Sequence, residues 1–194
     1  GPDGTVTGTT KIALSGQHLL ELRRSVDEDD PGKFEESLKT KLKETFPETF
    51  DRESLEIMEN GRNELKARFA YSIPAFADTA GGYMNIDLTM WHSTSMTRLF
   101  SAEKRKYDIL FPFLEMETSR VNFVLPEGIS IEALPEPGEI SCDFFSYSRS
   151  VKANGNTIEF ERVFKIINPK IEAKDYLAAR EFVNRVHDLD SEEL

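Results

Sequence analysis

The feature that most constrains this chain is a strict alternation of apolar and polar side chains along residues 64–73. The apolar positions of this run are Leu65, Ala67, Phe69, Tyr71 and Ile73. Because successive side chains of a β-strand point to opposite faces, the pattern predicts a strand with one buried face and one face in water. Asn60-Gly61 precedes the run and favours a hairpin turn, which pairs this strand with a shorter one beginning near Leu55.

The same two-residue period recurs along the chain and predicts a β-rich protein. Further strands are expected at residues 5–14, 83–91, 107–113, 115–125, 129–134, 139–151 and 156–167. Asn154-Gly155 joins the last two, and its tolerance of positive φ angles predicts a type I′ turn. In the final strand the charged Arg162 interrupts a row of apolar side chains at Ile158, Phe160, Phe164 and Ile166.

Three segments show the period of three to four residues that marks amphipathic helices. They are residues 17–25, 33–46 and 173–189. Ahead of the second, Asp30 is a suitable N-cap and Pro31 suits the first helical position. The combined pattern predicts a mainly β fold of the α+β class. We expect antiparallel β-sandwich-like subdomains, with two helices from the N-terminal half and one C-terminal helix packed on the sheets; a single continuous sandwich is the alternative.

Residues 92–106 lose this periodicity and collect serine, threonine, arginine and lysine, as boundaries between compact units do. We therefore expect two subdomains. The first, residues 3–95, is predicted as a β subdomain with the order strand, helix, helix, strand. The second, residues 96–194, is predicted as a β-sandwich-like subdomain with the terminal helix.

Charge and hydropathy argue against a nucleic-acid partner and against a membrane-spanning helix. The 194 residues include 24 basic and 35 acidic side chains, for a net charge of −11, so long-range forces repel nucleic acid. The longest apolar runs fall far short of the roughly 20 residues that a membrane-spanning helix needs. We therefore expect no nucleic-acid partner and no membrane span.

Residues that commonly carry covalent chemistry are few and scattered. Cys142 lies in a predicted strand with no base nearby in the sequence, so a packed core or interface thiol is expected. His18, His92 and His187 have no partner at metal-ligand spacing. We expect no metal, no cofactor and no catalytic residue, although a pair of carboxylates acting as acid and base stays an open alternative.

One predicted strand face combines aromatic and polar side chains, as sugar-binding surfaces do. Tyr83, Asp87 and Trp91 fall on the same face of the strand predicted at residues 83–91. These three residues are the candidate ligand-binding site. The alternative is that Tyr83 and Trp91 pack against a neighbouring sheet or against the helix predicted at residues 33–46.

A series of short motifs follows one another in an order that resembles a known family. In the second half they are KRKYDI (104–109), FPF (111–113), VNFVLPEG (121–128), IEALP (131–135), FSYS (145–148), GNTIEFER (155–162) and YLAAREF (176–182). In the first half, GTVTG (4–8) and FAYSIP (69–74) fit the same order. The series resembles the C-terminal β-domain region of exported bacterial transglutaminase-like proteins, the segment that follows their papain-like transglutaminase core.

This resemblance implies a non-catalytic accessory or interaction domain. The catalytic cysteine, histidine and aspartate of that family lie in the core, which this chain does not contain, so none of them transfers to it and Cys142 is not the nucleophile. The resemblance also implies a periplasmic, cell-surface or secreted location, with an adjacent transglutaminase-like domain or another protein as the partner. A glycan-binding β-module that uses Tyr83, Asp87 and Trp91 is the alternative function.

Overall fold

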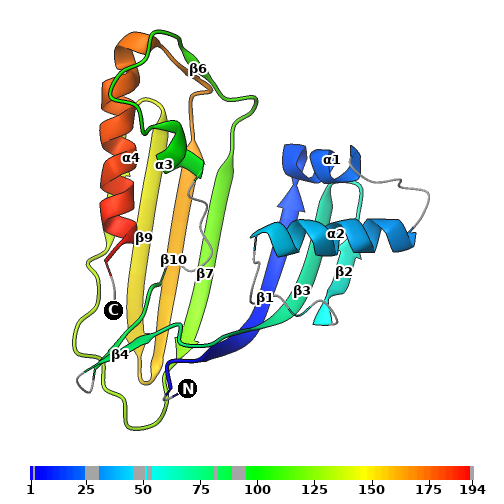
Figure 1. The fold of residues 1–194 in the computed structure, drawn as a ribbon, viewed down its shortest axis with the longest axis vertical. Coiled ribbons are helices and arrows are strands. Elements are labelled where there is room, and N and C mark those ends of the chain that lie inside the picture. Colours follow the sequence, from blue (N-terminus) through cyan, green and yellow to red (C-terminus); the bar gives the residue numbers. More distant parts are fainter. Residues whose placement is uncertain are drawn as a thin grey trace. The chain divides into compact units, whose positions relative to one another are not determined.

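A computed structural model describes residues 1, 3–24, 31–45, 51, 54–80, 83–88 and 95–192 of the chain. The contacts within its backbone divide the chain into two compact units, Gly1–Asp78 and Thr79–Leu194. The first unit is coloured blue to cyan in Figure 1, and the second runs from green to red. Each unit has its own main sheet and its own buried apolar side chains.

The first unit is a three-stranded antiparallel sheet with two helices (Figure 1). Its elements are β1 (Val6–Ser15), α1 (Gly16–Arg24), α2 (Pro31–Thr45), β2 (Glu56–Asn60) and β3 (Glu64–Ile73). β3 lies between β1 and β2. The buried face predicted for this strand is present in β3, where Leu65, Ala67 and Phe69 are each 0% exposed. α1 packs on β1 and β3 and buries Leu19 and Leu22.

Two further contacts complete this unit. α2 buries Phe34, Leu38 and Leu42 at the four-residue spacing that the sequence shows. Gly8 of β1 lies opposite Tyr71 of β3, and a Cβ atom added to Gly8 would lie 2.6 Å from the Tyr71 hydroxyl oxygen. The Tyr71 ring therefore occupies the space where a side chain at position 8 would lie. Only glycine leaves this space open.

The second unit is built on a four-stranded antiparallel sheet. The elements of residues 78–190 are β4 (Asp78–Ala80), β5 (Tyr83–Asn85), α3 (Ser95–Leu99), β6 (Ile109–Leu110), β7 (Met116–Val124), β8 (Gly138–Ser141), β9 (Phe145–Asn154), β10 (Thr157–Ile166), β11 (Lys170–Ile171), the 3-10 helix η2 (Ala173–Asp175) and α4 (Tyr176–Asp190). The strand order is β7-β10-β9-β8, so the connection from β7 to β8 carries the chain from one edge of the sheet to the other. β4 pairs with β5, and β6 pairs with β11, in two short sheets.

α4 lies against this sheet and closes the core of the second unit (Figure 1). It buries Tyr176, Ala179, Val183 and Val186 along one stripe. At the centre is Phe145, which is 0% exposed. Its ring centroid lies between 5.5 and 6.4 Å from those of Phe100, Phe111, Phe144, Phe164 and Phe182. Aromatic packing of this kind combines large buried area with fixed ring geometry, so it sets the distance between helix and sheet.

Side chains of α4 also bind the segment that follows α3. The Tyr176 hydroxyl donates to the carbonyl oxygen of Ala102 at 2.6 Å, and Nε of Arg180 donates to that of Phe100 at 3.1 Å. The rings of Tyr176 and Phe100 are stacked, with centroids 5.6 Å apart. These contacts attach α3 to α4 and so position the residues that α3 contributes to the cavity described below.

The predicted fold class is confirmed: the protein is mainly β, of the α+β class, with antiparallel sheets, two helices in the N-terminal half and one C-terminal helix. The layer that covers the four-stranded sheet is α4. Ser25 and Phe46, the last residues of two predicted helices, lie outside the described residues.

The subdomain ranges 3–95 and 96–194 stay a prediction, because compact units need not coincide with domains. No described helix is long and apolar enough to cross a bilayer.

Several local expectations differ from the structure. No strand forms at residues 129–134, the strand predicted at residues 107–113 is reduced to β6, and the one predicted at residues 139–151 is divided into β8 and β9. The strand predicted at residues 83–91 is short, because β5 ends at Asn85. The hairpin between β9 and β10 closes with the pair Asn154 and Thr157, which makes Gly155 and Asn156 the two loop residues. Of these two, Gly155 alone has a positive φ, 63°. A glycine with positive φ at the first loop position is typical of a type II′ turn, so the predicted type I′ turn is wrong.

Candidate functional site

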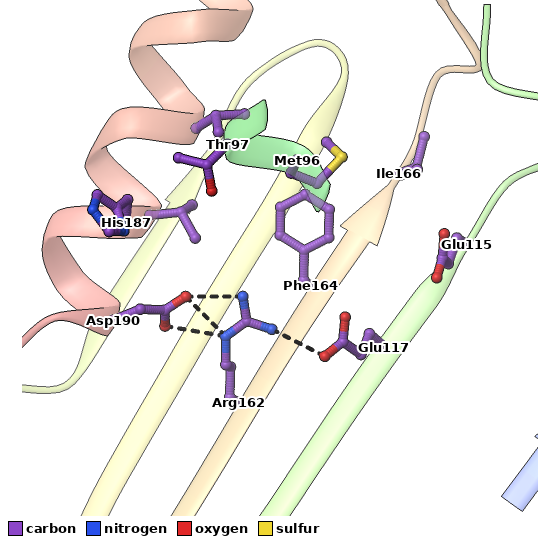
Figure 2. Close-up of a pocket in the computed structure, with 11 residues that line it drawn as sticks. Met96, Thr97, Glu115, Glu117, Arg162, Phe164, Ile166, His187 and Asp190 are labelled. Atoms are coloured by element: carbon purple, nitrogen blue, oxygen red, sulfur yellow. Dashed lines mark hydrogen bonds and ion pairs between the residues drawn. The ribbon is translucent and has the colours of Figure 1, made fainter. Parts of the chain in front are cut away.

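Arg162, which breaks the apolar row of β10, marks the most highly charged part of the interior. It is 5% exposed, as is Asp190 at the end of α4. Nε of Arg162 donates to the two carboxylate oxygens of Asp190 at 3.0 and 3.1 Å, and Nη2 donates to Oδ2 at 2.9 Å. Figure 2 shows this ion pair spanning the gap between helix and sheet. We refer to Arg162, Asp190, Tyr147 and Arg149, whose contacts follow, as the charge clamp.

The periods of the two elements explain why these charges meet. Asp190 follows Val183 and Val186 at the spacing of one helical stripe, so it lies on the buried side of α4. Arg162 shares its side of β10 with Phe160 and Phe164, which are buried as well. When stripe and strand face pack together, the two charges come into contact although they are 28 residues apart in sequence.

Tyr147 of β9 is a second hydrogen-bond donor to Asp190. Its hydroxyl donates to Oδ1 of Asp190 at 2.7 Å, and the Arg162 guanidinium lies 5.4 Å from the centre of its ring. Burial, and then the negative charge of Asp190, raise the pKa of Tyr147 well above its ordinary value. Burial alone would lower the pKa of Arg162, but the hydrogen bonds and the charge of Asp190 raise it. The phenol therefore stays a donor and the guanidinium stays charged.

Arg149 binds the same end of α4 through the main chain. In the register of β9 and β10 it lies directly opposite Arg162, and its side chain is 2% exposed. Its Nε donates to the carbonyl oxygen of Glu136 at 3.1 Å. Its Nη1 donates to the carbonyl oxygen of Leu189, and its Nη2 pairs with the Glu192 carboxylate. The last carbonyls of a helix carry partial negative charge, so a guanidinium is well placed there.

A cavity of about 100 Å³ lies beside the clamp, lined by residues of α3, α4, β10 and the start of β7 (Figure 2). Its polar lining is Thr97, Glu115, Glu117, Arg162, His187 and Asp190. Nη1 of Arg162 lies 3.6 Å from Oε1 of Glu117, which is an ion-pair distance longer than a hydrogen bond. A buried water needs about 10–15 Å³ of such space, so the cavity has room for several waters.

The polar groups around the cavity are engaged mainly with one another. Asp190 accepts hydrogen bonds from Arg162 and Tyr147, so its carboxylate is committed to the clamp. Glu117 is paired with Arg162. A general base needs a lone pair directed at substrate, and this arrangement directs the lone pairs at protein donors. Glu115 and Glu117 border the cavity, so they are the candidates for the carboxylate-pair alternative.

The predicted ligand-binding residues lie on the surface as far as the structure describes them. Tyr83 is on β5 and is 63% exposed, and Asp87 is exposed shortly after that strand. Ile86 and Leu88, which alternate with them, are buried. Trp91 lies outside the described residues. The alternation thus continues past the end of β5, and the role of these residues in binding stays a prediction.

Cys142 is partly buried and packs against the aromatic core of the second unit, as predicted for a core thiol. His187 borders the cavity, at the exposed side of the last turn of α4. Across the residues that the structure describes, no group of three or more histidine, cysteine, aspartate or glutamate side chains is arranged to hold a metal ion.

Comparison with known proteins identifies the second unit. Residues 86–194 match the family described as a Domain of Unknown Function with solved-structure structure (DUF3858). The chain belongs to the DUF3858 family. The match includes the whole charge clamp and the cavity, and it falls within the unit Thr79–Leu194. Neither the curated proteins nor the solved structures gave a match to the chain.

The charge clamp of this DUF3858 chain is the feature that sequence reasoning missed. Its signal is the arginine in the apolar row of β10, because a buried guanidinium requires a counter-charge. Asp190 lies in a short acidic stretch, Asp188–Glu193. Taken by itself, such a stretch favours a solvent-exposed helix end. Continuing the stripe of Val183 and Val186 by one turn selects Asp190 from that stretch.

Proposed function

We propose that this chain is a non-catalytic accessory domain that binds protein, within an exported bacterial transglutaminase-like protein. The observation that carries the proposal is the charge clamp. Arg162, Asp190 and Tyr147 are nearly fully buried and bond to one another, so these buried polar groups hold α4 on its sheet. What the unit then offers to other molecules is its outer surface.

The identity of the parent protein rests on the resemblance of the motif series to exported transglutaminase-like proteins. Under this proposal the chain lies in the periplasm or at the cell surface, and its partner is the adjacent transglutaminase-like domain or another protein. The DUF3858 match is compatible with such a module, since that family has no assigned activity.

The test has two parts. The purified chain is first assayed for hydrolysis and transfer on peptide amides and on glycosides. We expect no turnover, and turnover that is lost in Glu117→Gln or Cys142→Ser would overturn the non-catalytic assignment. The chain is then titrated by calorimetry with the separately purified transglutaminase-like core from its own gene product. Saturable binding supports the proposal, whereas a gene product without such a core, or a core that does not bind, contradicts it.

A glycan-binding module is the second candidate. It is favoured by the exposure of Tyr83 and Asp87 on one side of the chain, with Ile86 and Leu88 buried on the other. An exposed aromatic ring beside a carboxylate offers a stacking surface and a hydrogen-bond acceptor to a sugar. Calorimetry against a panel of oligosaccharides tests this, with Tyr83→Ala and Trp91→Ala as binding-site variants and Tyr107→Ala as a control at another exposed tyrosine. Binding that all three variants retain, or no binding, removes this candidate.

A further inference from the structure

The outer edge of β7 carries a row of main-chain groups that point away from the sheet. β7 pairs with β10 on one side only. The amide of Ile166 donates to the carbonyl oxygen of Glu115, and the amide of Leu125 donates to that of Asn156. These two bonds fix the phase of the antiparallel ladder, so odd-numbered residues of β7 bond to β10 and even-numbered residues direct their N–H and C=O groups outward.

Thr118, Arg120 and Asn122 therefore present unpaired donors and acceptors along the middle of this edge. No described residue is bonded to their outward main-chain groups. The strand is nine residues long, and its pairing with β10 runs from Met116 to Val124 without a bulge. A long and regular edge of this kind is a template for another strand.

The other edges of the two main sheets, as far as the structure describes them, carry features that discourage strand addition. β8 is four residues long and follows closely after Pro135 and Pro137. β2 is five residues long, and its register with β3 shifts at Ile57 and Glu59. β1 is long, but its exposed face is mostly polar and has Lys11 near the middle. Short strands, bulges and edge lysines are the usual protections of exposed edges.

β7 exposes apolar side chains at both of its ends. Met116 is 66% exposed and Val124 is 71% exposed, at the two ends of the strand. Leu114, just before the strand, is 59% exposed and continues the same outward row. Between them, Arg120 lies on the solvent face, where it pairs with Glu161 of β10. The edge thus combines open main-chain groups with two apolar ends and a basic centre.

We propose that the β7 edge binds an extended segment of a partner protein by strand addition, which gives the proposed interaction function its binding mode and rests on that function. The main chain of an added strand can replace the water on a whole row of outward N–H and C=O groups at once. Directly opposing side chains of neighbouring strands contact each other. The preferred segment therefore has apolar residues opposite Met116 and Val124 and an acidic residue opposite Arg120.

The same geometry argues against a second copy of the chain as the occupant. If two β7 strands pair antiparallel with full overlap, the twofold axis passes midway between the two copies of Arg120, which then lie opposite each other. Like charges at directly opposing positions are destabilising. A segment with an acidic residue at its centre and apolar ends has the complementary pattern instead, and the pattern is the same whether the segment runs parallel or antiparallel.

A nine-residue probe tests the proposal: the capped peptide Val-Ser-Thr-Ser-Glu-Ser-Thr-Ser-Val, titrated into the full chain labelled with ¹⁵N. We expect saturable amide shifts concentrated at Met116–Val124. A peptide with lysine in place of the central glutamate should bind at least tenfold more weakly. A peptide N-methylated at alternate residues, in the register that bonds to β7, should not bind, because it cannot complete the ladder.

Variants of the chain distinguish main-chain hydrogen bonding from nonspecific binding. Asn122→Pro removes one outward N–H but no bond to β10, so we expect at least a tenfold loss of peptide affinity, whereas Asn122→Ala should bind like the parent chain. If Asn122→Pro alters the fold, as judged by the amide spectrum, Met116→Ser serves in its place and should weaken binding severalfold.

The outcomes distinguish this inference from the proposed function. Shifts spread over other surfaces, equal binding of all peptides, or no binding overturn the β7 assignment. A dimer that forms with rising concentration and is disrupted by Asn122→Pro also overturns it, since the occupant is then a second copy. If the transglutaminase-like core binds Asn122→Pro and the parent chain equally well, the interaction function stands and the β7 site is wrong. If the core does not bind the parent chain, the function itself fails.

Discussion

Arg149 and Arg162 lie directly opposite one another on β9 and β10, and both are buried. Two like charges at opposing positions of adjacent strands repel each other, and removing them from water is costly. The last turn of α4 supplies what each one needs. Asp190 neutralises Arg162, and the carbonyl oxygen of Leu189 accepts a hydrogen bond from Arg149. The sheet of the second unit therefore depends on its helix electrostatically as well as through apolar packing.

Replacing Arg162 by methionine should strongly destabilise the second unit. The variant leaves the Asp190 carboxylate buried without its counter-charge, and breaking a buried pair in this way costs about 3–5 kcal/mol. Urea denaturation at pH 7, followed by tryptophan fluorescence and circular dichroism, measures the change in the free energy of unfolding. The double variant Arg162→Met with Asp190→Leu should recover much of the loss, because no lone charge remains inside.

The exposed pair of Arg120 and Glu161 provides the matched control for this experiment. It joins β7 to β10 at 2.6 Å but lies in solvent, where such pairs contribute about 0–1 kcal/mol. We expect Arg120→Met to change the free energy of unfolding by no more than that. If Arg162→Met costs as little as Arg120→Met, the charge clamp does not stabilise the fold.

Tyr147 should make the second unit sensitive to alkali. Burial and the charge of Asp190 raise its pKa in the folded state above the ordinary tyrosine value of 10.0. A group whose folded pKa is raised contributes stability that is fully present below the unfolded pKa and lost as the pH rises beyond it. Above about pH 10 the free energy of unfolding should fall by up to about 1.4 kcal/mol per pH unit from this residue alone.

The comparison of the parent chain with Tyr147→Phe between pH 8 and pH 11 checks this slope. The variant is expected to be less stable at pH 8, because it lacks the hydrogen bond to Asp190, but to lose less stability as the pH rises. Tyr107→Phe, at an 82% exposed tyrosine, should keep the slope of the parent chain. Parallel curves for the parent chain and Tyr147→Phe would contradict the prediction.

Asp108 should contribute to stability at neutral pH and not in strong acid. Its Oδ1 accepts a hydrogen bond from the amide of Ala173 at 2.9 Å, and Lys170 lies 3.1 Å from Oδ2. The amide hydrogen bond first, and then the lysine, lower the pKa of Asp108 below the ordinary value of 3.8. A lowered folded pKa means that the contribution is present above the unfolded pKa and disappears as the pH falls through the folded one. Asp108→Asn should therefore lower the melting temperature at pH 6, and the gap should close towards pH 2; a constant gap would count against this reading.

In the first unit, Gly8 and Tyr71 should be energetically coupled. A valine at Gly8 places atoms where the Tyr71 ring now lies, so Gly8→Val should destabilise the unit. In a Tyr71→Ala background that space is open, and the same substitution should cost less. Contacting pairs show coupling of about 0.5–3 kcal/mol in such double-mutant cycles. Additive effects of the two substitutions would show that the ring moves aside without cost.

Much of the fold follows from side-chain periods. The two-residue alternation predicts β3, β7 and β10, and the four-residue spacing of Phe34, Leu38 and Leu42 predicts α2, because both patterns report which side of an element is buried. The turn at Gly155 was predicted in place but not in type. Register decides the type, and register depends on hydrogen bonds along the whole hairpin.

The charge clamp and the exposed edge of β7 cannot be deduced from the spacing of apolar side chains along the sequence. The pairing of Arg162 with Asp190 requires that α4 cover one particular face of the sheet, which is a tertiary choice. The exposure of the β7 edge follows from the order β7-β10-β9-β8, in which β10 separates β7 from β9 and β8. Alternation within a strand says nothing about which strand lies beside it, so neither feature is visible in the sequence alone.

The position of α4 after all four strands has a consequence for the order of folding. The hairpin of β9 and β10 is local in sequence, whereas Leu189 and Asp190 come from the end of the last helix, so a hairpin formed before the helix docks holds two facing guanidinium groups without the acceptors that α4 supplies. Until then the arginines gain by staying hydrated, which opposes their burial. We therefore expect the hairpin and the terminal helix to become stable together rather than one after the other.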